Sequence, residues 1–179
     1  LDNTNTNVNL NAITVTGNLS VTTGGVITNS DALTITGTST FTTDVNNQTI
    51  TLNTTTNQFG GAVTLTTQGT TANVTIDGGT TALAIQGNVA GNLAVTAGAA
   101  ITDSAALTVS GTSRFTIDNG SNNITLGTAN LTGAITVSTT GTSDFTLDNT
   151  TTNVNLGTVG VTGNLSVTTG GTIIDSGVL

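Results

Sequence analysis

The chain of 179 residues lacks eight residue types: it contains no His, Cys, Lys, Glu, Tyr, Trp, Met or Pro. Without His or Cys no Ser/His or Cys/His pair can activate a nucleophile, and zinc, copper and iron lose their usual ligands. We therefore expect no enzyme activity and no cofactor. Asp is the only acid, with nine copies. Clustered Asp that cleave polysaccharide, as in some β-helix enzymes, are the one catalytic alternative, and a weak one.

Basic and long apolar segments are missing as well. Arg114 is the only basic residue and the formal net charge is −8, so the chain cannot neutralise a run of phosphates and we expect no nucleic-acid partner. No apolar run approaches the ~18 residues that span a bilayer, so we expect no membrane insertion. No secretory leader precedes the repeats, and Leu1 falls at an arbitrary phase of the period. We therefore expect an excerpt of a longer array.

A long internal repeat organises what is present. The segment at positions 33–44, LTITGTSTFTTD, returns at positions 107–118 as LTVSGTSRFTID. A second motif begins Gly-Asn-Leu at Gly17, Gly91 and Gly163. The copies of both motifs recur at a period of about 72–74 residues, and a fixed period built of short segments is typical of repeat architectures. We expect one continuous domain over residues 1–179, with copies at about 1–74 and 75–148 and a partial copy at 149–179.

Within each copy, Val, Ile and Leu alternate with Thr, which indicates short strands with one buried face. Thr is β-branched and suits the outer face of a sheet, whereas disordered chains avoid such residues. The expected strands centre on residues 8–10, 13–15, 19–21, 33–35, 41, 50–52, 63–65, 74–76, 83–85, 93–95, 107–109, 115–117, 124–126, 135–137, 145–147, 154–156, 159–161 and 165–167.

Two features favour an all-β, right-handed parallel β-helix (β-solenoid) over a sandwich or a meander of hairpins. Strands recur at roughly 20 residues, which is about one coil, as in Phe115 to Ile135, Ile124 to Phe145 and Phe145 to Leu165. The hairpin dipeptides Asn-Gly and Asp-Gly occur only once each. Each repeat would then hold three to four coils. About nine stacked coils predict a rod on the order of 40 Å long.

The Asp residues fit turns better than acid–base or metal chemistry. Four of them end the same pattern, Phe/Val-Thr-x-Asp, and a carboxylate there can accept backbone N–H bonds in an Asx turn. Two more, Asp103 and Asp175, stand where the first copy has Asn29, an exchange that suits hydrogen bonding. No calcium-binding nonapeptide is present, which leaves weak calcium binding at corner Asp as an open alternative. The four strand-end residues are Asp44, Asp77, Asp118 and Asp148.

The remaining side chains also favour structural roles. Arg114 precedes the inward Phe115, so we expect it to point outward and to be either solvated or paired with a neighbouring acid. Asn pairs such as Asn46–Asn47 and Asn122–Asn123 predict ladders that bond like to like from coil to coil. Four Phe and no Trp or Tyr give a weak signal for sugar binding. Outward Thr-x-Thr arrays are also a feature of ice-binding solenoids, but varying coil length disfavours that function.

The motifs LTVSGTSRF and GNLSVTTGG resemble the repeat region of large bacterial surface proteins, the filamentous haemagglutinin-like or "β-strand repeat" adhesins. The resemblance covers essentially the whole chain. It implies a β-helical shaft at the bacterial cell surface or in the extracellular space, secreted, and a part of an adhesive or biofilm filament. The Asn-Pro-Asn motifs of that family's secretion domain do not occur in these residues, which contain no Pro, so we do not expect that domain within them.

Two non-catalytic functions follow from this resemblance and the composition. The first is a structural shaft or extracellular fibre segment, whose partners are neighbouring repeats of the same chain or identical subunits stacked head to tail. The alternative is an adhesion module whose β-solenoid face binds a surface glycan or a partner protein. Ice-binding and polysaccharide-degrading β-helices come after these.

Overall fold

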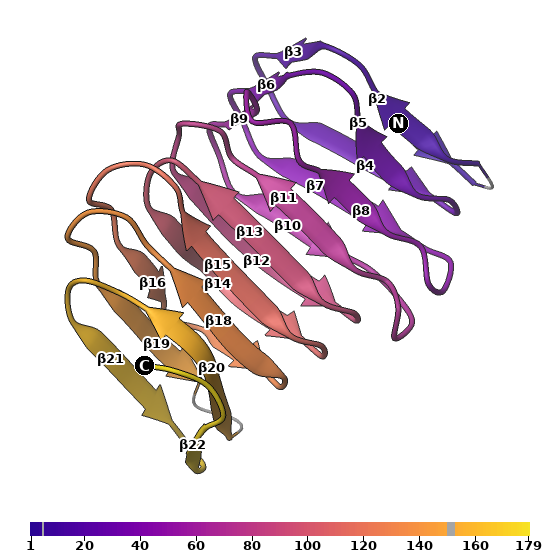
Figure 1. The fold of residues 1–179 in the computed structure, drawn as a ribbon. Helices are drawn as coiled ribbons and strands as arrows, with labels where there is room; N and C mark the ends of the chain where they lie inside the picture. Colours follow the sequence, from indigo (N-terminus) through magenta and orange to yellow (C-terminus); the bar gives the residue numbers. More distant parts are fainter. Residues whose placement is uncertain (5, 150–152) are drawn as a thin grey trace.

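The protein is described here from a computed structural model, which describes residues 1–4, 6–149 and 153–179. These residues form 22 short β-strands and no helix. The strands stack in parallel into three sheets, and the N- and C-termini lie at opposite ends of the stack (Figure 1). The fold is therefore the parallel β-solenoid expected from the repeats.

The first sheet contains β1 (Asp2–Asn3), β4 (Leu19–Thr23), β7 (Ser39–Thr43), β10 (Val63–Thr66), β12 (Leu83–Val89), β14 (Ile101–Val109), β16 (Ile124–Leu126), β19 (Phe145–Asn149) and β21 (Leu165–Thr169), with β17 (Ala129–Leu131) paired to β14. The second contains β2 (Val8–Leu10), β5 (Ile27–Asn29), β8 (Ile50–Leu52), β11 (Val74–Asp77), β13 (Leu93–Ala97), β15 (Ser113–Ile117), β18 (Ala134–Ser138), β20 (Val154–Gly160) and β22 (Ile173–Asp175). The third contains β3 (Ile13–Val15), β6 (Leu33–Ile35) and β9 (Gln58–Phe59).

Alternation along each strand builds one continuous core. In β15, Ser113, Phe115 and Ile117 are buried whereas Arg114 is exposed, as the alternation predicts. The same pattern repeats in the neighbouring coils, so inward Val, Ile, Leu and Phe stack on one another from Val8 to Val159. The apolar side chains of one coil are buried by those of its neighbours, because a single coil is too small to bury them by itself.

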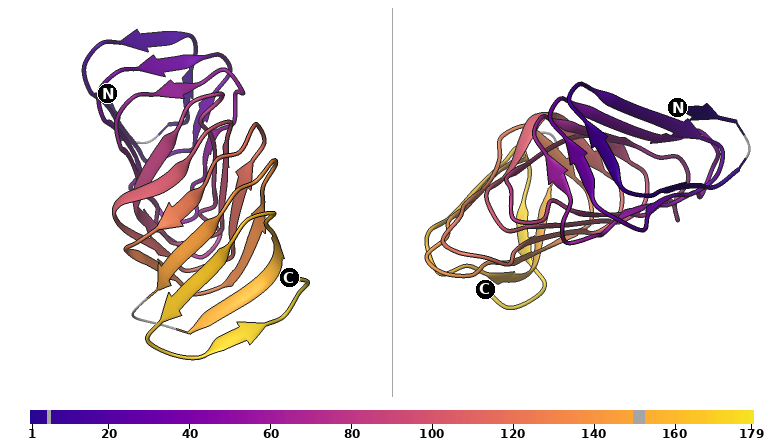
Figure 2. Two further views of the ribbon diagram at one scale, coloured as in Figure 1. Left: turned by 90° about the vertical axis from the view of Figure 1, so that its left-hand side faces the viewer. Right: turned by 90° about the horizontal axis from the view of Figure 1, so that it is seen from above.

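The coils vary in length. Val21 pairs with Phe41 and Phe41 pairs with Leu65, so the second of these coils is longer than the first. The solenoid consequently makes about eight turns, not the nine that a uniform length predicts. Figure 2 shows that the stack also twists from end to end, as parallel strands do.

The register confirms all three expected strand pairs and shifts one of them by two residues. Ile124 pairs with Phe145, and Phe145 with Leu165, as expected. Phe115 pairs with Val137 and not with Ile135, because Ile135 lies opposite Ser113. The sequence pattern missed five strands, which are β1, β5, β9, β17 and β22.

Each sequence repeat makes three and a half turns of the solenoid. The Gly-Asn-Leu motif forms β4 in the first sheet, its second copy forms β13 in the second sheet, and its third copy forms β21, again in the first sheet. Successive repeats are therefore rotated by half a turn, and the same sequence occupies opposite faces of the shaft.

The third sheet follows this half-turn. In the first repeat, β3 and β6 lie where the chain passes from the second sheet to the first. Their second copies, residues 87–89 and 107–109, form the ends of β12 and β14, where the chain passes from the first sheet to the second. The third sheet therefore ends at β9. The equivalent residues of the second repeat begin at Gly87 and lie on the opposite side of the solenoid, where they extend the first sheet.

Gly87 makes this change possible, and we expect Gly87→Ala to destabilise the fold by about 1–3 kcal/mol. Its φ of 114° is a conformation that side chains disfavour, and an added Cβ would press on the carbonyl oxygen of Leu65. Urea unfolding would measure the loss. Gly17→Ala is the matched control, since a Cβ there meets open space. Equal effects of both substitutions would contradict this interpretation.

Candidate functional site

Several aspartates accept hydrogen bonds from backbone N–H groups. Asp77 accepts a hydrogen bond from the backbone N of Gly79 at 2.7 Å, and Asp175 accepts one from Gly177 at 3.1 Å, so both form the expected Asx turn. Asp103 differs from its copy Asp175. Its carboxylate reaches the next coil and accepts bonds from Gly127 N at 2.7 Å, and from Thr128 N at 2.6 Å and Oγ1 at 2.9 Å.

The other strand-end aspartates stand at coil junctions. The backbone N of Asp44 donates to Thr23 O, and that of Asp118 donates to Ala97 O. Both side chains are exposed, whereas Asp148 is half-buried. In the described part of the chain, no group of three or more Asp gathers where a metal ion could be held. This arrangement offers hydrogen bonding between coils.

The fold perturbs the ionisation of Asp77. Burial raises the pKa of Asp77 above its ordinary value; the Gly79 N–H bond opposes this shift, and the charge of Asp118 adds to it. A raised pKa in the folded state means that stability is fully present below the ordinary pKa and is lost as the pH rises through the folded pKa.

We therefore expect Asp77→Asn to be more stable than the original chain at about pH 7, and the advantage to vanish at about pH 3. The amide oxygen can keep the bond to Gly79 N. The difference should stay below about 1 kcal/mol, because part of the carboxylate still reaches water. Urea unfolding of both proteins across this pH range measures it. A difference that grows as the pH falls would contradict the assignment.

Asn and Asp at the strand starts link the coils in a way that the sequence pattern missed. The Asn92 Oδ1 accepts the backbone N–H of Thr112 at 2.8 Å, and the Asn73 Oδ1 accepts that of Asn92. The expected amide-to-amide ladder is wrong at Asn47, whose Oδ1 accepts from the backbone N of Thr71. It is also wrong at Asn122, whose Nδ2 donates to the backbone O of Gly98 and Asn119. Amide pairs between coils do occur inside the solenoid, where Asn29 Nδ2 donates to Asn57 Oδ1 at 2.8 Å.

The outer face of the first sheet carries two hydroxyl columns. The first consists of Ser20, Thr40 and Thr64, and the second of Thr22, Thr42 and Thr66, each aligned by strand register. Both columns end at β12, where Gln86 and Asn88 take the next places. Arg114, on the second sheet, stands between Ala94 and Thr136 and is exposed, as expected.

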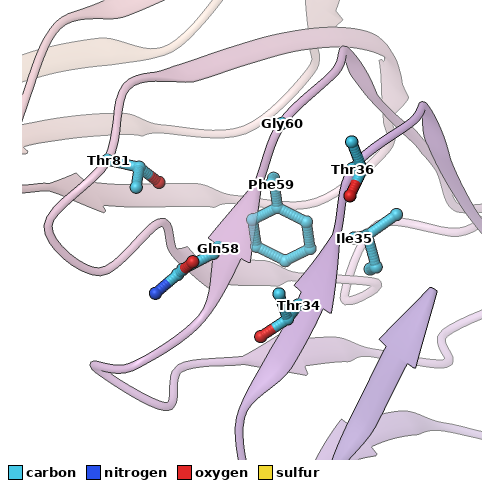
Figure 3. Close-up of a pocket in the computed structure, with 7 residues that line it drawn as sticks. All are labelled: Thr34, Ile35, Thr36, Gln58, Phe59, Gly60 and Thr81. Atoms are coloured by element: carbon cyan, nitrogen blue, oxygen red, sulfur yellow. The ribbon is translucent and has the colours of Figure 1, made fainter. Parts of the chain in front are cut away.

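A small notch marks the point where the third sheet ends. Figure 3 shows Phe59 of β9 beside Ile35 of β6, with Thr81 on the far side. The notch has a volume of about 200 Å³, and the Phe59 ring meets Phe41 edge-on at 6.3 Å. This volume suits at most a small molecule, and the lining holds no charged group. The complete lining is Thr34, Ile35, Thr36, Gln58, Phe59, Gly60 and Thr81.

No helix in the described ranges is long and apolar enough to cross a membrane.

A model of a protein family described as repeats of unknown function (DUF5649) matches residues 1–66, 71–138 and 142–179. No curated protein and no solved structure matched the chain.

Proposed function

Because the chain belongs to the family of repeats of unknown function (DUF5649) and is a β-solenoid throughout, we propose that it is a structural shaft. In this proposal the shaft is a segment of a secreted bacterial surface or adhesin-type protein, or of an extracellular fibre, and has no catalytic role. The observation that carries the proposal is the continuous core from Val8 to Val159, across which strands of neighbouring repeats pair in parallel.

In a shaft, each repeat must pack against the next one. The half-turn between repeats is compatible with this packing, because the same motif is covered in either sheet. The core side of the Gly-Asn-Leu motif is buried by the next coil both at β4 and at β13, although these strands lie in different sheets. Adding repeats therefore lengthens the rod by about 4.8 Å per coil without a change of interface.

The experiment that tests this function locates and sizes the protein in its source. Antibodies against this segment are expected to label thin rods on unpermeabilised cells or in the surrounding medium by immunogold electron microscopy. The intact chain, or the assembly, should have a mass far above the 17.6 kDa of this segment. Labelling only after permeabilisation, or discrete particles without rods, would overturn the proposal.

The second candidate, an adhesion face that binds a glycan or a partner protein, is favoured by the two hydroxyl columns on β4, β7 and β10. They present hydroxyl groups at the strand spacing over three coils. A glycan array would test it, with Thr42→Val as the variant expected to lose binding. The columns' interruption at Gln86 and Asn88, the uneven coils and the twist argue against an ice-binding plane.

A further inference from the structure

The corner between β15 and β16 holds the one Asn-Gly sequence of the chain, Asn119-Gly120. Asn119, Gly120 and the following Ser121 are all exposed. Among the described residues, none forms a hydrogen bond with the Asn119 side chain or with the backbone N–H of Gly120. Gly120 has a φ of 68°, and the lack of a Cβ leaves its backbone nitrogen uncrowded. A side-chain amide and an unbonded backbone nitrogen are therefore adjacent in an exposed bend.

Two neighbouring groups of this kind can react with each other in water. Hydroxide removes the proton of the Gly120 nitrogen, which then attacks Cγ of Asn119. The Cγ–Nδ2 bond breaks, and the leaving nitrogen takes a proton from water and departs as ammonia, which regenerates the hydroxide. The product is a cyclic succinimide that water opens at either carbonyl, so that position 119 becomes an aspartyl or an isoaspartyl residue. The net reaction converts an amide and water into a carboxylate and ammonium.

The Asp-Gly sequence of the chain, Asp77-Gly78, is protected from the same ring closure by the fold. The backbone N of Gly78 donates to Thr96 O at 2.9 Å, in the next coil. The Asp77 side chain is only 9% exposed and accepts the N–H of Gly79 at 2.7 Å. The Gly78 nitrogen cannot attack the preceding side chain unless the bond to Thr96 breaks, and a buried N–H group left without a partner is costly.

The first repeat has no reactive pair at the equivalent corner. Since residues 33–44 correspond to 107–118, Val45 stands at the place of Asn119. The Asn46-Asn47 pair that follows is held by the next coil, because the backbone N of Asn47 donates to Gln68 O at 2.6 Å. Asn119-Gly120 thus differs from these other corners in combining exposure with an unbonded nitrogen.

We propose that Asn119 is a deamidation site, at which the folded chain converts its amide into a carboxylate with water and without an enzyme. The conversion adds a negative charge beside Asp118 in an acidic chain. The isoaspartyl product also inserts one carbon into the backbone between residues 119 and 120. At present the Asn119 carbonyl accepts a bond from Asn122 Nδ2, and the Gly120 carbonyl accepts one from Thr140 Oγ1 in the next coil, both at 3.0 Å. The corner therefore changes its charge and its contact with the next coil over time. This inference goes beyond the proposed shaft function and does not depend on it.

The test incubates the folded 179-residue chain in a mildly alkaline buffer and follows its mass. After unfolding, trypsin can cut only at Arg114, the one basic residue, which yields residues 1–114 and 115–179 for tandem mass spectrometry. The amide-to-acid mass gain is expected at Asn119 at least about tenfold faster than at any other Asn, because only Asn119 precedes an uncrowded Gly nitrogen. A synthetic peptide of residues 116–123, TIDNGSNN, gives the rate without the fold. The folded chain should convert within about fivefold of this rate, since an exposed corner needs little free energy to open.

Two variants assign the reaction to this residue. Asn119→Gln should remove the early mass gain, because its longer side chain would have to close a larger ring more slowly. Asn53→Gln is the matched control, since Asn53 is exposed and precedes Thr54, and it should leave the gain unchanged. A protein isoaspartyl methyltransferase should label the incubated original chain and not the incubated Asn119→Gln variant. Conversion of the peptide but not of the folded chain, a first gain at another Asn, or equal labelling of both chains would overturn the proposal.

Discussion

Phe115→Ala is expected to lower the free energy of unfolding by about 3–5 kcal/mol. The ring is fully buried and lies between Val95 in the coil below and Val137 in the coil above. Its removal leaves a cavity that parallel strands cannot close, because their spacing is fixed by the backbone hydrogen bonds. The two coil interfaces should weaken together.

Urea unfolding followed by circular dichroism would measure this loss. Arg114→Ala is the matched control, since the neighbouring side chain is exposed and its removal should change the free energy of unfolding by less than about 0.5 kcal/mol. Hydrogen exchange would locate the destabilised region. In the Phe115→Ala variant, the amide exchange rates of β13, β15 and β18 should increase more than those of strands near the two ends of the rod. A small, equal effect of both substitutions would show that Phe115 is not a core residue.

Asn57→Leu is expected to cost more than about 3 kcal/mol, although it replaces a polar residue with an apolar one of similar size. The Asn57 side chain is fully buried and completely bonded. Its Oδ1 accepts from Asn29 Nδ2 at 2.8 Å and from Leu33 N at 3.0 Å, and its Nδ2 donates to Leu52 O and Asp77 O, both at 3.2 Å. Leu would leave three buried backbone groups without these partners, at about 1–3 kcal/mol each.

The same unfolding measurement serves here, with Asn53→Leu as the control, because Asn53 lies in the same connection and is exposed. If Asn57→Leu were neutral or stabilising, the amide would not be what joins these three coils. The substitution should destabilise the coils on both sides of Asn57, because its partners lie in the preceding coil, in its own coil and in the following coil.

These two residues show why the sequence predicted one part of the core and missed another. Phe115 lies in an alternation of apolar and polar residues, and a period of two places its side chain on the buried face in any sheet. Asn57 lies in the polar run Asn53–Asn57, which indicates an exposed loop. Its burial depends on the coils above and below it, which bring Leu33 N and Asp77 O within reach.

The aspartate hydrogen bonds also include some that the sequence predicts and one that it does not. The turn role of Asp77 and Asp175 is local, because the carboxylate bonds to the backbone two residues on, and the sequence predicts it. The contact of Asp103 with Gly127 and Thr128 is not local. Its copy Asp175 shares the following Ser but has Ile174 before it and Gly177 two residues on, where Asp103 has Thr102 and Ala105, and its carboxylate accepts a bond from the backbone N of Gly177.

The sequence alone determined most of the strands, the approximate length of a coil, the parallel solenoid and the absence of His and Cys, because all of these depend on residue types and short periods. Only the tertiary structure decided the register, the half-turn between repeats and the end of the third sheet at β9. The physical reason is that each corner changes the length of a coil by a few residues. Those changes add up over a repeat, and only the stacked strands show on which face the next copy begins.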